Sequence, residues 1–249
     1  NPLHFYVAYA SGGLWETKNG GTSYDPLFDN EMVMSIGDIA VNWNTKTIYV
    51  GTGENNSSRS SYSGIGIFKS TNNGKTWTHI GLADTQHIGR IVLHPTNGQI
   101  LWVAAMGHLY SDNEERGIYK SNNGGRSWAK TLFVDDKTGA IDLVVDPINP
   151  NVLYASMWQR NRKAWNFDGS GMGSGIYKST DGGQHWNEIS GGNSGFPDTK
   201  GTGRIGLAIY PKNPKIIYAI LDNQDRRPEE KKERLSTGLT KDQINAMDK

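Results

Sequence analysis

The segment Ser179-Thr-Asp-Gly-Gly-Gln-His-Trp186 decides the fold, because three other segments repeat its pattern. Each has a hydroxyl residue first, Asn or Asp third, glycine fifth and an aromatic residue eighth. The other three read Thr17-Lys-Asn-Gly-Gly-Thr-Ser-Tyr24, Ser70-Thr-Asn-Asn-Gly-Lys-Thr-Trp77 and Ser121-Asn-Asn-Gly-Gly-Arg-Ser-Trp128. A short apolar run precedes each copy, so the repeated unit is a strand, a tight turn and an aromatic residue that opens the next strand.

The residue types in this unit match what a tight hairpin turn requires. One residue must tolerate positive φ, and side chains must accept hydrogen bonds from the freed backbone amides. The glycines supply the first property: Gly21, Gly74, Gly125 and Gly183. The third residues supply the second, because their short side chains accept from amides of their own turn: Asn19, Asn72, Asn123 and Asp181. We expect the aromatic residues to pack between neighbouring sheets: Tyr24, Trp77, Trp128 and Trp186.

Two further strand patterns recur with each turn. In one repeat they are Leu143-Val-Val145 and Val152-Leu-Tyr-Ala155, joined by the turn Asp146-Pro-Ile-Asn-Pro150. Four strands in a unit of about 40 to 60 residues are typical of a β-propeller. We therefore predict an all-β fold, a β-propeller of four-stranded antiparallel blades, and expect a four-to-five-blade segment of a larger propeller.

The four turns resemble the Asp-box, or bacterial neuraminidase repeat, of sialidases, xyloglucan-cleaving glycoside hydrolases and sortilin-type propellers. The resemblance extends over residues 4–224. Gly51-Thr-Gly-Glu-Asn55 and His87-Ile-Gly-Arg90 are similar to segments of large bacterial proteins that are grouped with the sortilin N-terminal domain and often labelled glycosyl hydrolase. This resemblance implies an extracellular, periplasmic or cell-surface location.

The pattern divides the chain into two parts. Residues 1–224 carry the propeller repeats, with approximate units 1–30, 31–82, 83–133, 134–190 and 191–224. Residues 225–249 contain a charge run and then capping-box spacing from Thr240 to Gln243, which predicts a charged linker and a short helix. We expect this part to be an insertion or a truncated continuation, and the chain, which starts at Asn1, to be processed or excised.

Composition excludes several classes of function. The chain has 249 residues, a formal net charge of +1 and no cysteine. A near-neutral charge gives no reason to expect nucleic acid, and without cysteine there is neither a disulfide framework nor a thiolate metal site. No histidine or acidic cluster has metal-ligand spacing, so we expect no metal and no cofactor. No apolar run is long enough to span a bilayer.

The loops opposite the Asp-box turns are the expected location of a ligand site, because loops on a rigid scaffold carry function. The most informative loop combines Arg160 and Arg162 with Trp158 and Trp165, a mixture suited to sugar rings and to acidic or sulfated groups. In the alternative interpretation, the aromatic residues pack the loop onto the blade and the cations are solvated. His108, in the preceding loop, is a further candidate contact.

A second candidate set comes from aligning the innermost strands of the repeats. The alignment puts Asp38, Arg90, Asp142 and Arg204 in one column at the mouth of the channel, with alternating charge. Such residues form structural ion pairs between blades, or Arg90 and Arg204 clamp an anionic ligand.

An enzymatic function requires other residues. Glycoside hydrolysis normally needs two carboxylates that flank the scissile bond, and the weak candidates are Glu54, Asp112 and Asp168. The Phe-Arg-Ile-Pro motif of sialidases is absent. In xyloglucanase-like proteins the cleft lies between two propellers, so part of such a site would be outside this chain.

These observations favour a secreted or cell-envelope bacterial propeller that binds a polysaccharide or a protein or peptide ligand, with glycoside hydrolysis as the alternative. The remainder of a larger propeller, or a companion chain, is the other expected partner.

Overall fold

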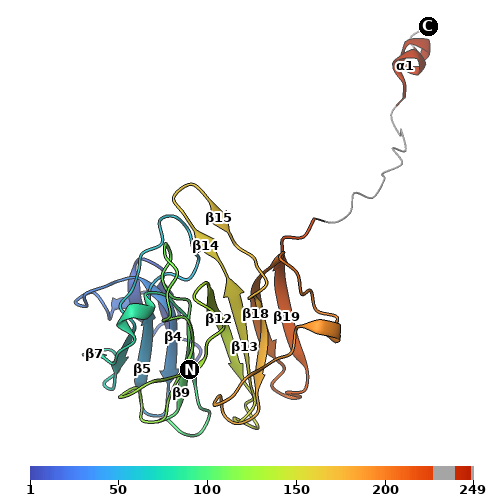
Figure 1. Ribbon diagram of the computed structural model, residues 1–249. Helices are drawn as coiled ribbons and strands as arrows, with labels where there is room; N and C mark the ends of the chain where they lie inside the picture. The colour runs from blue at the N-terminus through green and yellow to red at the C-terminus, as the bar shows by residue number, and fades with distance from the viewer. Residues whose placement is uncertain (227–238, 248–249) are drawn as a thin grey trace.

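The computed structural model describes residues 1–226 and 239–247. Antiparallel sheets stand side by side in chain order, from the N-terminal sheet to the β18–β19 pair (Figure 1). The first sheet has the order β1-β2-β3, and the next three have four strands each, in the orders β4-β5-β6-β7, β11-β10-β9-β8 and β12-β13-β16-β17. We call these sheets and the β18–β19 pair blades 1 to 5. The predicted all-β propeller of four-stranded blades is confirmed.

The strands are short, and most of their lengths match the apolar runs in the sequence. The bounds in blades 1 and 2 are β1 (Phe5–Tyr9), β2 (Gly13–Thr17), β3 (Asp25–Pro26), β4 (Ile36–Asn42), β5 (Thr47–Thr52), β6 (Ile67–Ser70) and β7 (Thr78–His79). Blade 3 consists of β8 (Ile88–Leu93), β9 (Leu101–Ala105), β10 (Gly117–Ser121) and β11 (Ala129–Leu132). Blade 4 consists of β12 (Thr138–Val145), β13 (Leu153–Gln159), β16 (Gly175–Ser179) and β17 (Asn187–Glu188).

Smaller elements complete the described chain. A separate hairpin, β14 (Asn161–Arg162) and β15 (Phe167–Asp168), extends from blade 4, and blade 5 consists of β18 (Thr202–Ile209) and β19 (Ile217–Asn223). The helical elements are the 3-10 turns Ala83–Thr85 and Gly192–Ser194 and the helix α1 (Lys241–Met247). Thr240 and Gln243 exchange backbone-to-side-chain hydrogen bonds at the start of α1. Most of the predicted charged linker lies outside the described residues.

Each Asp-box turn is held by two of its own side chains. The first residue's hydroxyl accepts from the fifth residue's amide, at 2.8 to 2.9 Å in all four turns, as in Ser121 and Gly125. The third residue's oxygen accepts from the seventh residue's amide at 3.0 Å, as in Asn123 and Ser127. The fifth glycines have φ between 79° and 91°, where a Cβ would strain the backbone.

The tryptophans of the turns fasten each blade to the one before it. Trp77 Nε1 donates to the Leu27 carbonyl and Trp128 Nε1 to the Ile80 carbonyl, both at 2.7 Å. Trp186 Nε1 lies 3.3 Å from Thr131 Oγ1. Apolar side chains fill the space between adjacent blades, and the largest such cluster joins blades 3 and 4 around Trp102, Leu143 and Leu153.

Removing one turn hydroxyl tests this description. Ser121 is 1% exposed, so Ser121→Ala leaves the Gly125 amide buried without its acceptor. We expect the free energy of unfolding to fall by about 1–3 kcal/mol in urea titrations. Ser127→Ala, an exposed position in the same turn, is the control and should change it by about 0.5 kcal/mol or less. Equal effects of the two substitutions would contradict the assignment.

Candidate functional site

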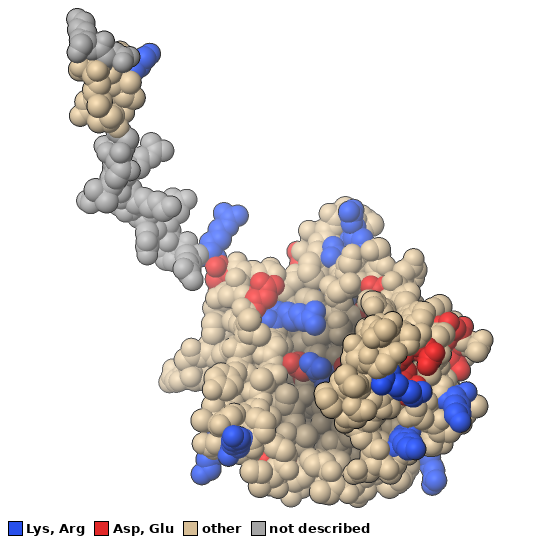
Figure 2. All heavy atoms as spheres, turned by 180° about the vertical axis from the view of Figure 1, so that it is seen from behind, with Lys and Arg blue, Asp and Glu red and all other residues tan. Residues whose placement is uncertain are grey.

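The loops between the second and third strands of blades 2, 3 and 4 form one face of the molecule, at the opposite end of the sheets from the Asp-box turns. They span residues 53–66, 106–116 and 160–174, and we call this surface the loop face. The β14–β15 hairpin projects from it (Figure 1). Basic and acidic side chains are visible on the wall of the hollow between the sheets (Figure 2).

An ion-pair network links three blades inside the channel. Arg90 Nε lies 2.8 Å from Asp142 Oδ1, and Arg90 Nη1 lies 3.7 Å from Asp38 Oδ1. Each aspartate also accepts an amide of the following blade, Asp38 from Ile91 at 2.7 Å and Asp142 from Leu207 at 2.8 Å. These contacts connect blades 2 to 5, as the structural interpretation of the column expects, and the binding of an anionic ligand by Arg90 and Arg204 stays a prediction.

Arg204 does not occupy the column that the sequence alignment gave it. Gly206 lies five residues before Pro211, as Asp142 lies five residues before Pro147. Gly206, opposite Ile220, therefore takes the place that Arg90 has opposite Ala104. Arg204 nevertheless reaches a channel hollow of about 110 Å³ that Arg90 and Asp142 also line. Its Nη1 donates to the Asn55 carbonyl at 3.2 Å.

Arg160 is buried rather than displayed on the loop face. It is 2% exposed, and its Nη2 is 3.3 Å from the Met106 carbonyl and 3.4 Å from that of Gly107. Nε and Nη1 have no hydrogen-bonding partner among the described residues. Burial, followed by repulsion from Arg116, lowers the pKa of Arg160 to about 9. Arg160 lies between β13 and β14, and its side chain points into the protein toward the carbonyls of blade 3, which the loop prediction did not include.

The sequence analysis missed Arg116, which organises the loop of blade 3. This side chain is 1% exposed and donates to four backbone carbonyls at 2.9 to 3.3 Å: those of Met106, Lys137, His108 and Ser111. These acceptors lie up to 21 residues away in sequence. No local motif identifies such a residue.

Arg162 joins the hairpin to the loop of blade 2. Its Nε and Nη2 donate to the Ser57 carbonyl at 2.9 and 2.7 Å, and its guanidinium lies 4.0 Å from the Phe167 ring centroid. Trp158 is buried and donates to the Gly169 carbonyl at 2.8 Å. Trp165 is the exposed aromatic residue of this loop, with 82% of its surface accessible, and Phe167 is half-buried.

The three loops meet around a hollow of about 550 Å³. Its lining comes from all three and consists of Ser58, Arg59, Ser60, Tyr110 and Ala164. Tyr110 Oη donates to the Arg59 carbonyl at 2.7 Å, which connects two of the loops. Trp165 follows Ala164 directly, so an aromatic surface adjoins the hollow. This volume is within the range of small-molecule and peptide-side-chain pockets.

Two histidines at or near the loop face form hydrogen bonds with backbone carbonyls. His108 Nδ1 lies 2.9 Å from Ser111 Oγ and Nε2 lies 3.1 Å from the Asp84 carbonyl. His87 is 1% exposed, with Nδ1 2.8 Å from the Glu54 carbonyl. Burial, and then the charge of Arg160, lowers the pKa of His87 to about 4, so the ring is neutral at physiological pH.

The candidate catalytic carboxylates do not pair in the described structure. Glu54 is 7% exposed and accepts from the Tyr62 amide at 3.2 Å and from Asn56 Nδ2 at 3.3 Å. Asp168 accepts from Asn166 Nδ2 at 3.0 Å, and Asp112 is exposed. Within the described ranges, no hydrogen bond joins two of the three, and Glu54 serves to close its own loop.

Comparison with known proteins places the chain in a family. The sequence model of Sortilin-Vps10, described as sortilin, neurotensin receptor 3, matches residues 66–245. The chain belongs to the Sortilin-Vps10 family. Among curated proteins no match is found.

Solved structures similar to this Sortilin-Vps10 chain share the propeller fold. An ancestral GH74 enzyme has a TM-score of 0.64 and 24% identity over 89% of this chain and 26% of the enzyme. The GH74 xyloglucanase of Xanthomonas campestris has a TM-score of 0.62 and 16% identity over 89% and 34% of the two chains. YCF48 bound to D1 peptide has a TM-score of 0.53 and 14% identity over 90% and 59%. The chain thus spans about a quarter of the ancestral enzyme's length.

Two features are absent from the part of the chain that the structure describes. In residues 1–226 and 239–247, no helix is long and apolar enough to cross a membrane. No group of three or more His, Asp or Glu side chains in those ranges is placed to hold a metal ion.

The channel network makes a pH-dependent prediction. Burial raises the pKa of Asp38 to about 6, although Arg90 and the Ile91 amide act in the opposite direction. The folded state therefore binds the Asp38 proton more tightly than the unfolded state does. Protonation of Asp38 stabilises the folded state at pH values below the unfolded pKa, and this stabilisation is lost as the pH rises through about 6. Relative to Asp38→Asn, the wild type should lose about 3 kcal/mol of unfolding free energy between pH 3 and pH 7. A flat difference in urea titrations over this range would contradict the raised pKa.

Proposed function

We propose that this Sortilin-Vps10 chain is a binding module whose loop face takes an acidic segment of a protein partner. The hollow of about 550 Å³ between the three loops carries this proposal. Because each loop comes from a different blade, the rigid sheets hold the lining in place before a ligand arrives, which reduces the ordering cost of binding.

The charges at the hollow support an acidic ligand, since the exposed Asp112, Glu114 and Asp168 of the same loops do not line it. Arg59 lines the hollow, and Lys163 immediately precedes Ala164 of the same lining. The nearby acid Glu54 is buried and already accepts two hydrogen bonds. Guanidinium groups bind carboxylates through paired hydrogen bonds, so a Glu- or Asp-containing segment suits this surface. The similar structure of YCF48 bound to D1 peptide is consistent with a polypeptide ligand on such a scaffold.

Carbohydrate is the second candidate ligand, and exposed aromatic rings favour it. Trp165, Tyr62 and Tyr110 are 82%, 65% and 53% exposed on the loop face. Flat apolar rings with polar edges suit stacking on sugars. The candidate carboxylates Glu54, Asp112 and Asp168 do not pair with one another in the described residues. Glycoside hydrolysis would therefore require carboxylates from outside this chain.

We also propose an extracellular, periplasmic or cell-surface location in a bacterium. This proposal rests on the family resemblance.

Binding to an array of short peptides graded in net charge, and to a panel of neutral, acidic and sulfated polysaccharides, tests the function. We expect the acidic peptides to bind, and Arg59→Ala/Trp165→Ala to raise their Kd about tenfold or more. The matched control is Arg126→Ala/Trp43→Ala, an exposed Arg and Trp at the other end of the sheets, which should leave Kd unchanged.

Other results would overturn the proposal. Binding to polysaccharides alone would replace the polypeptide partner by a sugar, and release of reducing ends would support the hydrolase. No binding to any probe, or equal weakening by the control variant, would exclude the loop face as the site.

A further inference from the structure

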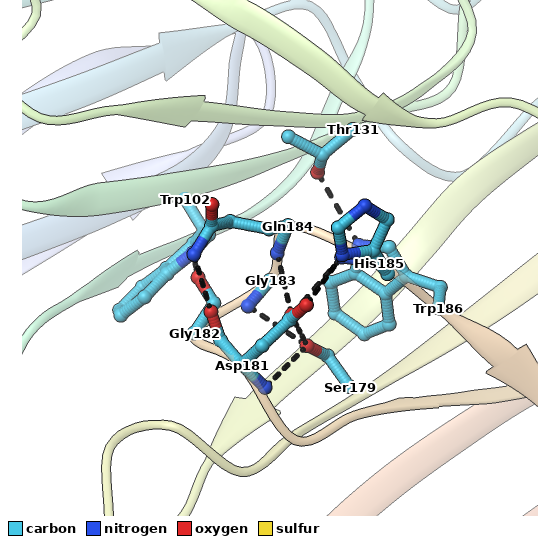
Figure 3. A network of polar contacts seen from close by, with 9 residues as sticks. All are labelled: Trp102, Thr131, Ser179, Asp181, Gly182, Gly183, Gln184, His185 and Trp186. Carbon is cyan, nitrogen blue, oxygen red and sulfur yellow. Dashed lines mark hydrogen bonds and ion pairs between the residues drawn. The ribbon is translucent and has the colours of Figure 1, made fainter.

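Buried polar groups in this protein generally have partners, and the Asp-box turn of blade 4 is an example. Trp102 Nε1, on a residue that is 1% exposed, donates to the Gly182 carbonyl at 3.0 Å (Figure 3). In the same turn, the Gly183 amide donates to the Ser179 hydroxyl at 2.8 Å. A buried donor without an acceptor loses its hydration and gains no hydrogen bond in return, so each such donor requires an explanation.

The exceptions occur mainly at two arginines. In the described part of the chain, five buried side-chain nitrogen and oxygen atoms lack a hydrogen-bonding partner, and three of them are Nε and Nη1 of Arg160 and Nε of Arg116. The two side chains are neighbours, because Arg160 Nη2 and Arg116 Nη1 both donate to the Met106 carbonyl, at 3.3 and 2.9 Å. A fourth atom is Ser57 Oγ, on the residue whose carbonyl accepts from Arg162. The unpartnered groups thus belong to residues of the loops of blades 2, 3 and 4.

Positive charge accumulates around Arg160. Three further arginines, Arg116, Arg162 and Arg204, lie close enough that their repulsion, after burial, lowers the pKa of Arg160 to about 9, and the side chain still carries its charge at neutral pH. All four donate to backbone carbonyls, and within the described ranges no ion pair joins any of them to a carboxylate. More distant carboxylates partly oppose the lowering of the pKa of Arg116 and of Arg204, whereas the charges that act on Arg160 are all positive.

The surroundings of Arg160 do not balance its charge. The side chain is 2% exposed, and burial of a charge without a counter-charge is strongly unfavourable. An arginine does not relieve this cost by losing its proton, as a lysine or a histidine does. The Trp158 ring centroid lies 5.8 Å from Arg160 Cζ and 5.6 Å from Arg204 Cζ, but its Nε1 donates to the Gly169 carbonyl, so the indole supplies an apolar wall. Such surroundings favour a negative ion beside the guanidinium.

We propose that an inorganic anion of the size of chloride binds beside Arg160, inside the loop face, and accepts from its unpartnered N–H groups. A carboxylate on a partner segment cannot reach a side chain that is 2% exposed, and a single-atom ion needs the least space. The ion neutralises one of the four clustered charges and thereby stabilises the meeting of the loops of blades 3 and 4. The site is separate from the hollow proposed for an acidic segment, because Arg160 is not part of that lining.

Urea unfolding of the complete 249-residue chain, in sodium chloride and in sodium gluconate at equal ionic strength, tests the proposal. One ion that binds only the folded state should lower the unfolding equilibrium constant about tenfold for each tenfold rise in chloride above its Kd. Bromide should act like chloride, and gluconate, which is too large to enter, should have no such effect. Arg160→Gln should abolish the chloride dependence. Arg126→Gln, at an exposed position at the other end of the sheets, should preserve it.

Crystals of the wild type grown in sodium bromide give a second measurement, which holds even where Arg160→Gln does not fold. We expect an anomalous bromide peak within hydrogen-bonding distance of Arg160 Nε or Nη1. A water molecule at that position, bromide peaks at the protein surface only, or an equal chloride dependence in Arg160→Gln would overturn the proposal. Arg59→Ala/Trp165→Ala should keep the full chloride dependence, so that failure of the ion site and failure of the proposed peptide site are distinguished.

Discussion

The hydrogen bonds inside the Asp-box turn are the constraint on which the rest of the structure depends. Ser121 and Asn123 satisfy amides that the chain reversal exposes, and Gly125 adopts the positive φ that the reversal needs. Because the turn is rigid, its carbonyls and its tryptophan meet the preceding blade in one orientation. Repetition of this contact sets the angle between successive blades, and so gathers the long loops of blades 2 to 4 on one face.

A second set of contacts acts at the inner end of the blades. Asp38 and Asp142 each accept an amide from the next blade, and Arg90 lies between them. Removal of one charge from such a network would leave its partner buried and uncompensated. This costs more free energy than the intact pair contributes to stability. The network therefore specifies how the blades meet more than it adds to stability, and it leaves the loops free to vary.

The sequence predicts the elements that depend on local chemistry. Turn residues and strand periodicity were enough to predict the four-stranded blades. The position predicted for Arg204 is wrong because Gly206 precedes the turn at Pro211 by five residues, as Asp142 precedes the turn at Pro147, so Gly206 and not Arg204 corresponds to Asp142. Arg116 was missed because its acceptors come from separate segments of the chain. The burial of Arg160 depends on carbonyls of blade 3, more than 50 residues away.

The same distinction applies to the site. Local sequence predicts a site on the loop that carries Trp165, whereas the hollow beside it forms from three loops that only the propeller brings together. Buried polar groups such as Glu54 and His87 support this surface from within, through hydrogen bonds to backbone groups. The proposed site thus depends on how the blades assemble the loops.

Amide hydrogen exchange of the free protein tests the central role of the turns most directly. The turns lie at the surface, where unconstrained amides exchange rapidly. We expect the amides of Gly74, Gly125 and Gly183 to exchange as slowly as those in the middle of β9 and β13. These amides become accessible to exchange only when the contacts between blades break. Exchange of these three amides at the rate of exposed loops would contradict it.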